Sequence, residues 1–336
     1  MSAPLRLGIV GAGAVTQVAH LPVLTKMKGI TVAALADGDL VKATALASRF
    51  GVPLAFEDLA EMLEKTPLDA LLVCTPNHLH ESHVLLALST GLHVMVEKPL
   101  ATTVVAAERI RDAGARAGKL VMVGMSHRYR SDVQTIRSFV EKKALGTVES
   151  VQGVWHTFRP SRAVLGWRER RAEAGGGAML DLGLTVLDLS LWLLGNPTPL
   201  RVSANLDAMP DDRGVERAGC AFVVCEGGAS ISVDVNWRHV GPGERFEVGL
   251  RGTKGTAAMN PLRVWQDLNG IATDVAPTGA GARENLFTSA VRAEWAHFLT
   301  AVADRSRSPS IDAQIRLHRL LEAVYRSARE GKEVMV

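Results

Sequence analysis

Near its start the chain reads Leu5-Arg-Leu-Gly-Ile-Val-Gly-Ala-Gly-Ala-Val-Thr16. Four of the six residues in Leu5–Val10 are Leu, Ile or Val, which is typical of a strand buried in a parallel sheet. Gly11 and Gly13 then predict a tight turn, because glycine lets the backbone bend sharply and approach a ligand closely. The stretch therefore predicts the first strand and turn of an α/β domain.

The residues after this turn, 14–26, predict a helix whose free N–H groups and positive dipole end would face a pyrophosphate. Thr16 stands where the full dinucleotide fingerprint has its third glycine. An ordinary strand-to-helix turn is therefore the alternative. The position after a strand and before a helix favours a dinucleotide site. Its predicted contacts are Gly11, Gly13, Ala14 and Val15.

The bulk composition is that of an ordinary globular protein, and the length predicts two domains. The 336 residues are 47% hydrophobic and 22% charged. The net charge of +3 is small and the basic residues are scattered, so we expect neither nucleic acid nor a membrane as a partner. No apolar run approaches the length expected of a membrane helix.

The amino-terminus and the cysteines predict where the protein resides. Residues 1–4 lead straight into the first strand, and no signal peptide is visible. Cys74, Cys220 and Cys225 form neither a disulfide framework nor a CxxC metal pair. We therefore expect a cytoplasmic protein without a metal site.

The second apolar segment, Ile30–Ala36, predicts a strand that ends on Asp37. Asp37 follows Gly13 by 24 positions, near the spacing at which a carboxylate meets the adenosine ribose hydroxyls. No arginine stands beside Asp37 and Asp39 to take a 2′-phosphate, which favours NAD and makes NADP the less favoured cofactor. The alternative is that Asp37 only caps the next helix.

Strand and helix alternate through the rest of the first half, as in an open parallel sheet covered by helices. The helix that follows Asp37 is predicted to end at Phe50, before Gly51. Further helices are predicted at residues 57–64, 78–89 and 103–117, and strands at 69–75, 92–96 and 120–125. Two strands stop at Thr75-Pro-Asn77 and Glu97-Lys-Pro99. Both breaks fall at carboxyl strand ends, which border the crevice where ligands bind.

Lys98 is the residue of this half with the clearest chemical role. It stands at a strand's carboxyl end and precedes Pro99, which stops the hydrogen-bond ladder. Its side chain is therefore predicted to point into the crevice. Beside a nicotinamide cation such a lysine is suited to acid–base chemistry, and a solvated lysine is the alternative.

Motifs along nearly the whole chain occur together. The first half contains Gly11-Ala-Gly-Ala-Val15, Thr75-Pro-Asn-His-Leu-His80, Val96-Glu-Lys-Pro-Leu100 and Gly124-Met-Ser-His-Arg-Tyr129. The second half contains Gly175-Gly-Gly-Ala-Met-Leu-Asp-Leu-Gly-Leu-Thr-Val-Leu-Asp188 and Ala323-Val-Tyr-Arg-Ser327. On these motifs the chain resembles the glucose–fructose oxidoreductase/inositol dehydrogenase/rhizopine catabolism (Gfo/Idh/MocA) family.

The resemblance implies NAD(P)-dependent hydride transfer to or from a secondary alcohol of a sugar, cyclitol or related polyol. Lys98 would hydrogen-bond the reacting oxygen, and Asp181 would help position the substrate. The implied cofactor contacts are Thr75, Pro76, Asn77, His80, Glu97, Lys98 and Arg128, with Trp167 and Arg168 closing over the cofactor. The implied substrate contacts are Lys98, His127, His156, Asp181 and Thr185.

Thr185 departs from the family pattern. The family's dehydrogenases usually carry a histidine four residues after the aspartate as the proton acceptor, and here Thr185 follows Asp181 at that spacing. Positions 181, 185 and 188 share one helical face, yet a threonine hydroxyl does not titrate near neutral pH. Either Lys98 transfers the proton itself, Thr185 relays it through water, another residue substitutes, or redox catalysis has been lost. The candidates for substitution are His127, His156 and Tyr129.

Thr185, in place of the histidine, also favours two alternative functions. One is a glycosidase that oxidises and re-reduces its substrate with bound NAD. The other is a regulatory protein that senses the cofactor without turnover. The presence of Lys98 and Asp181 favours the dehydrogenase.

The segment that leads into the Asp181 helix is rich in arginine. It contains Arg159, Arg162, Arg168, Arg170 and Arg171. A cluster of this kind is either a solvated face or, because it precedes the site helix directly, a receptor for a carboxylate or phosphate.

The second half predicts a large, mostly antiparallel open sheet. Segments 147–158, 200–208, 218–225, 229–237, 245–250 and 256–259 are predicted strands; 284–304 and 310–330 are predicted helices; and 272–283 is a predicted loop. Gly227-Gly228, Gly241 and Gly243 predict hairpins between strands. Because a sheet covered on one face needs a partner on the other, we expect a homodimer or homotetramer.

The chain is thus predicted to be an α/β protein of two domains. Residues 1–126 would form a Rossmann NAD(P)-binding domain. Residues 127–336 would form an α+β domain for substrate binding and oligomerisation, whose last helix is expected to pack back on the first domain.

Overall fold

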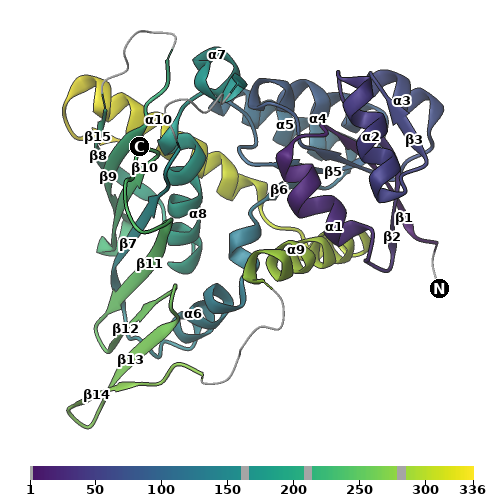
Figure 1. Cartoon of the computed structure of the whole chain (residues 1–336). Helices are drawn as coiled ribbons and strands as arrows, with labels where there is room; N and C mark the ends of the chain where they lie inside the picture. Colours follow the sequence, from purple (N-terminus) through teal and green to yellow (C-terminus); the bar gives the residue numbers. More distant parts are fainter. Residues whose placement is uncertain (1–2, 160–165, 208–213, 278–284) are drawn as a thin grey trace. The chain divides into compact units, whose positions relative to one another are not determined.

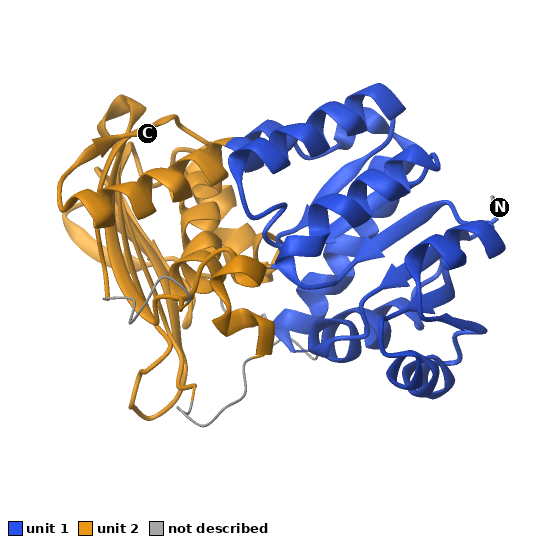
Figure 2. Ribbon diagram, turned by 90° about the horizontal axis from the view of Figure 1, so that it is seen from above, with its two compact units in different colours: residues 1–126, 284–315 blue, residues 127–283, 316–336 orange. Residues whose placement is uncertain are grey.

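The computed structural model describes residues 3–159, 166–207, 214–277 and 285–336. The chain divides into two compact units (Figure 2): unit 1 is Met1–Ser126 with Glu284–Ile315, and unit 2 is His127–Arg283 with Arg316–Val336. The first division between the units falls after Ser126, at the predicted domain boundary. Glu284–Ile315 was predicted in the second domain, whereas the structure places it in unit 1.

Unit 1 contains a six-stranded sheet in which all neighbouring strands are parallel. Its strands are β1 (Leu5–Val10), β2 (Ile30–Ala36), β3 (Leu54–Phe56), β4 (Ala70–Val73), β5 (His93–Glu97) and β6 (Val121–Gly124). Their order, β3-β2-β1-β4-β5-β6, is that of a dinucleotide-binding doubly wound sheet. The predicted Rossmann fold is confirmed.

Helices connect these strands (Figure 1). They are a π-helical turn (Thr16–His20) that continues into α1 (Leu21–Leu24), α2 (Leu40–Phe50), α3 (Leu59–Lys65), α4 (His80–Ser89) and α5 (Val104–Ala117). Unit 1 also contains α9 (Leu286–Ala303), which comes much later in the chain. Gly51 and Gly118 end α2 and α5 in the left-handed region, as their positions predicted. Strand β3 was not predicted, because three residues are too few to show an alternating pattern.

Unit 2 contains a nine-stranded sheet in the order β14-β13-β12-β11-β7-β10-β9-β8-β15. Its strands are β7 (Val148–His156), β8 (Pro199–Leu206), β9 (Ala218–Cys225), β10 (Ser230–Asn236), β11 (Arg245–Gly252), β12 (Gly255–Ala258), β13 (Arg263–Leu268), β14 (Ile271–Asp274) and β15 (Val334–Met335). Its helices are α6 (Ser131–Glu141), α7 (Arg171–Ala174), a π-helical turn (Met179–Gly183) that continues into α8 (Leu184–Leu193), and the larger part of α10 (Ile311–Glu330).

The sheet of unit 2 is mostly antiparallel, as predicted, with one parallel pair, β7 and β10. The hairpin predicted at Gly241 and Gly243 is wrong, because β7 lies between β10 and β11 and pairs with both. The predicted loop 272–283 is also wrong in part, since its first residues belong to β14; residues 278–283 lie outside the described part of the chain.

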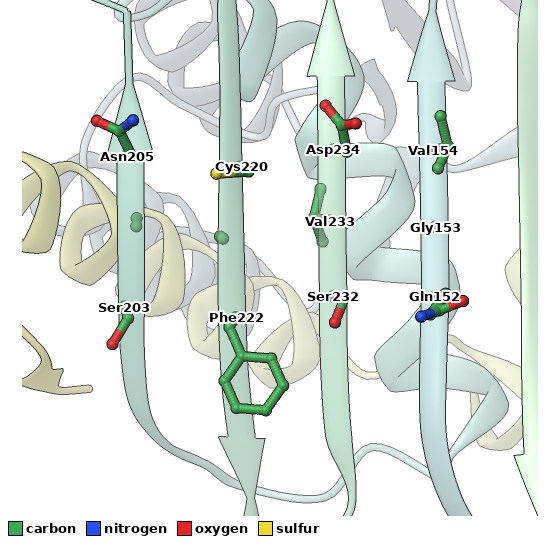
Figure 3. Close-up of a pocket in the computed structure, with 12 residues that line it drawn as sticks. Gln152, Gly153, Val154, Ser203, Asn205, Cys220, Phe222, Ser232, Val233 and Asp234 are labelled. Carbon is green, nitrogen blue, oxygen red and sulfur yellow. The ribbon is translucent and has the colours of Figure 1, made fainter.

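The two faces of this sheet differ. Gly153 faces α8 so closely that a Cβ there would overlap Val186. Side chains alternate along a strand, so the neighbouring residues of β7 face away from α8. Figure 3 shows this open face, with Ser203, Cys220, Phe222 and Asp234 presented on it and helices behind the sheet. The face contains a hollow of about 660 Å³.

The segment Arg171–Leu193 is long and apolar enough to cross a membrane, contrary to the expectation from the sequence. In the structure 89% of its apolar window is buried. The segment contains α8, whose Leu184, Val186, Leu187 and Leu189 are fully buried. Such burial is what the core helix of a folded unit requires.

Candidate active site

The glycine turn after β1 is shaped for close approach of a ligand. Gly11 has φ +102°, and a Cβ on it would lie 2.5 Å from the carbonyl oxygen of Cys74. Thr16 is fully buried, and its hydroxyl donates to the Gly11 carbonyl at 2.6 Å. Thr16 therefore closes the turn where the fingerprint has its third glycine. Gly13, Ala14 and Val15 lie at the start of the helical segment, whose free N–H groups suit a pyrophosphate.

Asp37 lies at the carboxyl end of β2, beside this turn. Its Oδ2 accepts from the Ala12 N–H at 2.6 Å and from Lys42 Nζ at 3.1 Å, and its Oδ1 accepts from the Asp39 N–H at 3.0 Å. The N-cap of α2 is Asp39, whose side chain accepts from the Lys42 N–H. The alternative that Asp37 only caps this helix is therefore wrong.

Lys42 was not predicted from the sequence, because it follows Asp37 by five positions instead of standing beside it. One turn into α2 it reaches back to Asp37, and 39% of its side chain is exposed. The Asp37 carboxylate would repel a 2′-phosphate at this position, whereas the ammonium group of Lys42 would attract it.

His80 connects the strand ends β4 and β5. Its Nδ1 lies 2.7 Å from the Pro99 carbonyl oxygen and its Nε2 lies 2.9 Å from that of Thr75. Burial lowers the pKa of His80, outweighing the carbonyls and Glu97, which raise it. A neutral ring has one N–H and donates to one carbonyl at a time. Since His80 is only 1% exposed, it positions the loops that carry Thr75 and Lys98 rather than lining an open surface.

Glu97 is held by a buried chain of hydrogen bonds that the sequence did not indicate. Trp295 Nε1 donates to His20 Nδ1 at 3.0 Å, and His20 Nε2 lies 2.9 Å from Glu97 Oε1. Because the indole N–H can only donate, Nδ1 is the acceptor and the ring proton sits on Nε2, facing Glu97. Burial by itself would raise the pKa of Glu97, but His20, Lys98 and His80 lower it overall. Glu97 is thus an anchored carboxylate directly before Lys98.

Lys98 itself follows β5 at the carboxyl edge of the sheet, and it is half-buried. Its N–H donates to Glu97 Oε2 at 3.3 Å. Thr75 lies beyond the end of the neighbouring strand β4, and its hydroxyl contacts His83 Nδ1 at 3.0 Å. Pro76 and Asn77 lead from Thr75 into α4. The structure therefore gathers the predicted residues of unit 1 at one edge of its sheet.

In unit 2, a buried carboxylate holds the start of the helical segment that carries Asp181. Glu216 is 1% exposed, and its Oε1 accepts from the N–H groups of Gly177 at 2.8 Å and Met179 at 3.0 Å and from the Tyr325 hydroxyl at 2.7 Å. Burial raises the pKa of Glu216 despite these donors, which lower it. The glycines are required here, because a Cβ on Gly177 would overlap the Glu216 carbonyl and one on Gly176 would overlap Tyr325.

Asp181 lies in a π-helical turn, a distortion that is frequent at functional sites. The Asp181 side chain is 27% exposed, and its Oδ2 accepts from Arg159 Nη2 at 2.5 Å. Thr185 and Asp188 are each 3% exposed. The prediction of one common face therefore holds only in part: the wider turn separates a partly exposed Asp181 from two buried residues.

Other predicted site residues of unit 2 have partners of their own. Arg128 donates Nε and Nη2 to the two oxygens of Asp188, at 2.7 and 2.5 Å, so its guanidinium is held in a buried bidentate pair. The His127 ring packs against Trp155 and Phe246, with centroids 5.2 and 5.0 Å away. These contacts place both residues in the packing beside α8.

His156 lies on the open face of the sheet, on the side away from α8. Its Nε2 is 3.1 Å from Asp234 Oδ1, although the geometry is not that of a hydrogen bond, and its ring packs in a tilted arrangement against His239. The period-two alternation of β7 puts Gly153 and Trp155 toward the helix and His156 on the opposite face. His156 is therefore not brought together with Thr185, and its prediction as a replacement for the missing histidine is wrong.

The arginine-rich segment separates into different environments. Arg170 pairs with Glu173, and the Arg171 guanidinium lies over the Tyr325 ring. The Arg168 guanidinium carbon lies over the Trp167 ring, 4.4 Å from the ring centroid. Arg162 lies outside the described residues. Within the described ranges no group of three His, Cys, Asp or Glu residues could hold a metal ion.

Comparisons with known proteins agree with this arrangement. Residues 5–125 match the family model GFO_IDH_MocA, described as an oxidoreductase family with an NAD-binding Rossmann fold. Residues 133–258 match the GFO/IDH/MocA C-terminal domain. The sequence is 34% identical to the D-glucoside 3-dehydrogenase of Escherichia coli K12, in an alignment that covers 61% of this chain and 58% of that enzyme.

Two solved structures are similar over almost the full length. One is GenD2 from gentamicin A biosynthesis in complex with NAD, which is 27% identical with a TM-score of 0.85, covering 100% of this chain and 97% of that chain. The other is an aldose-aldose oxidoreductase from Caulobacter crescentus complexed with glycerol, which is 26% identical with a TM-score of 0.84, covering 99% and 100% of the two chains.

Proposed function

The chain belongs to the Gfo/Idh/MocA oxidoreductase family, and from that premise we propose that it transfers a hydride between NAD and a secondary alcohol of a sugar, cyclitol or related polyol. One observation carries the proposal. In unit 1 a glycine turn without room for a Cβ, the carboxylate of Asp37 and the strand-end Lys98 all lie at the carboxyl ends of one parallel sheet. The relatives named above, a glucoside dehydrogenase and an aldose oxidoreductase, support a sugar substrate.

The residues present fit a dinucleotide. Gly11, Gly13 and the N–H groups of Ala14 and Val15 would hold the pyrophosphate, and Asp37 would accept from the adenosine ribose. The open edge at Thr75, Pro76 and Asn77 would receive the nicotinamide end. When bound, NAD supplies the acceptor or donor of the hydride.

The residues of the chain would manage the proton and the substrate. Lys98 would hydrogen-bond the reacting oxygen and exchange its proton, while Glu97, held by His20 and Trp295, keeps a negative charge next to it. Asp181 would orient the substrate through a hydroxyl group. Thr185 is 3% exposed, which supports proton transfer by Lys98 over a relay through water.

A screen of sugars and polyols with NAD, followed by absorbance of the reduced cofactor, tests the proposed function. We expect turnover of at least one secondary alcohol. NAD that does not exchange would favour the glycosidase, and binding of NAD without turnover across a wide panel would favour the regulatory protein.

The cofactor preference gives a prediction at Asp37. Asp37→Ala should weaken NAD binding roughly tenfold to a hundredfold, since a hydrogen bond to a charged group contributes about 1.5–3 kcal/mol. NADP binding should change less, because the carboxylate no longer repels the 2′-phosphate and Lys42 stays nearby. The dissociation constants for NAD and NADP, measured by titration, should therefore become more similar.

Two further variants control this measurement. Asp37→Asn keeps the acceptor for Ala12 and removes only the charge, so it should also bring the two dissociation constants closer together. Asp39→Ala removes the neighbouring carboxylate that caps α2, so it should lower stability and leave their ratio unchanged. Tighter binding of NADP than of NAD to the unmodified protein would contradict the assignment.

The open face of the unit 2 sheet supports a homodimer or homotetramer, with a second copy as the partner. Phe222 is 46% exposed on this face. Sedimentation at micromolar protein should show a dimer or tetramer, and Phe222→Glu should shift it toward the monomer. Val105→Glu, at a residue of α5 that is 58% exposed, should have no such effect. A clean monomer of the unmodified protein would refute the proposed assembly.

We also propose a cytoplasmic location. The three cysteines are unpaired, and Cys220 is exposed. A reducing compartment such as the cytosol keeps cysteine thiols from forming disulfides, so these free thiols support the proposal.

A further inference from the structure

Arg159 and Asp181 form an ion pair within unit 2. Arg159 Nη2 donates to Asp181 Oδ2 at 2.5 Å, and the two side chains are 24% and 27% exposed. Within the described ranges Asp181 is the one acceptor that the Arg159 guanidinium reaches, and its Nη1 is buried without a hydrogen-bond partner. A buried donor that is left unpaired costs stability, so the needs of the fold alone do not account for the place of this guanidinium.

Trp237 holds the Arg159 side chain. The guanidinium carbon lies over the Trp237 ring, 4.2 Å from the centroid, and Trp237 is 2% exposed. The Arg159 N–H donates to the Trp237 carbonyl at 2.7 Å, and the Trp237 N–H donates in turn to the Arg217 carbonyl at 2.7 Å. Because both the backbone and the guanidinium of Arg159 contact one buried residue, the Nη2 donor has a defined position.

Asp181 stands on a backbone that is fixed separately. The Glu216 carboxylate accepts from the N–H groups of Gly177 and Met179. The Glu216 carbonyl accepts from the Ala178 N–H at 2.9 Å, and the Asp181 N–H donates to the Gly177 carbonyl at 2.8 Å. These bonds fix the backbone of Asp181 and leave its side-chain torsions unset, so the direction of the carboxylate depends on the groups that meet its oxygens.

We propose that Arg159 is a positioning residue for Asp181: it directs the ionised carboxylate so that Asp181 accepts a hydrogen bond from a substrate hydroxyl. An ionised carboxylate only accepts hydrogen bonds, and each oxygen can accept more than one, so the bond from Arg159 leaves room for a second donor. The partial exposure of Asp181 keeps it within reach of a ligand. The inference rests on the proposed function, in which Asp181 orients a polyol. The carboxylate that this part of the arginine-rich segment receives is then one of the chain itself.

The first test follows the carboxylate directly. In a crystal structure of Arg159→Met, Asp181 should leave its present rotamer or adopt several, while the backbone around it stays in place because the Glu216 bonds remain. The matched control is Arg238→Met, which removes an exposed guanidinium that pairs with Asp207 at 2.5 Å and should leave the Asp181 side chain as it is. An unchanged Asp181 side chain in Arg159→Met would overturn the inference.

A double-mutant cycle then tests whether Arg159 acts through Asp181. Glucose, galactose, xylose and myo-inositol are screened with NAD, and the compound that is turned over fastest is the probe. Arg159→Met should lower kcat/KM for this compound about tenfold and leave KM for NAD unchanged, because a misdirected Asp181 no longer orients the substrate. In the Asp181→Asn background the same substitution should lower kcat/KM less than about twofold, since residues that act through one contact are not additive. An equal loss in both backgrounds would overturn the inference.

Arg159→Lys replaces Arg159→Met in the cycle if the methionine variant does not fold, which thermal unfolding checks. Lysine keeps a cation that can donate to Asp181 and loses the planar fork, so kcat/KM should fall by a smaller factor. This loss should again vanish in the Asp181→Asn background, and a loss that persisted there would overturn the inference. Absence of NAD binding and of turnover across a wide panel would instead reject the proposed function, whereas the crystallographic comparison needs no substrate and tests Arg159 by itself.

Discussion

Lys98→Met should abolish turnover and leave NAD affinity nearly unchanged. The substitution keeps an unbranched side chain at the end of β5 and removes the only group there that the proposed mechanism uses to move a proton. General acid–base catalysis contributes about 10²–10⁴-fold, so a loss of this size in kcat is expected. Single-turnover kinetics and titration with NAD separate the chemical step from cofactor binding.

The control for this variant is Lys65→Met. Lys65 lies at the end of α3, pairs with Glu61 and is 60% exposed, so the same substitution there should change neither kcat nor NAD affinity. Thermal unfolding of both variants checks that the fold is intact. Near-normal turnover of Lys98→Met would show that the lysine-centred mechanism is wrong.

Thr185→Val distinguishes a proton relay from a bystander. Valine keeps the shape of threonine and removes the hydroxyl. If Lys98 transfers the proton alone, the effect on turnover should stay below tenfold, or about 1.4 kcal/mol in the activation free energy, and the pH–rate profile should show no separate histidine limb. A larger loss with unchanged substrate binding would favour the relay.

Gly177→Ala should destabilise unit 2 strongly, although it adds only one methyl group. The new Cβ would overlap the backbone carbonyl of Glu216, and neither backbone has a flexible end that can move aside. Overpacking of this kind costs about 3 kcal/mol. A loss of that size lowers Tm by roughly 6–12 °C in a unit of this length, which differential scanning calorimetry measures.

Gly249→Ala is the matched control in the same unit. A Cβ at Gly249 would lie 3.6 Å from the Ala257 carbonyl oxygen, which is ordinary contact, so Tm should change by a small fraction of that amount. If Gly177→Ala were as stable as Gly249→Ala, the close packing of Glu216 against the start of the Asp181 segment would be refuted.

The pattern of unit 1 follows closely from the sequence. The apolar run of β1, the glycine turn and the spacing to Asp37 are local features, because a strand, a turn and a helix each form from neighbouring residues. Parallel strands joined by helices have few arrangements, so a run of such segments predicts the sheet. The carboxyl strand ends then predict Lys98 and Thr75 at one edge.

The strand order of the unit 2 sheet, unlike that of unit 1, does not follow from the sequence pattern. Glycines between β10 and β11 are compatible with a hairpin, yet β7, which lies more than 70 residues before β10 in the chain, pairs with both strands. Strand alternation also decides the face on which a side chain lies, and a shift of one residue reverses it. For this reason His156 could be placed beside Thr185 from the sequence and lies on the opposite face in the structure.

The sequence by itself determined the family, the Rossmann fold, and the positions of Lys98, Asp181 and Asp37 in their motifs. Only the tertiary structure decided what holds them. Trp295 reaches His20 across 275 positions to anchor Glu97, and Tyr325 reaches Glu216 across 109 positions at the start of the Asp181 segment. The periodicity of apolar residues indicates which face of a helix or strand is buried. The hydrogen-bond partner of a buried polar side chain depends instead on how elements distant in the chain pack together.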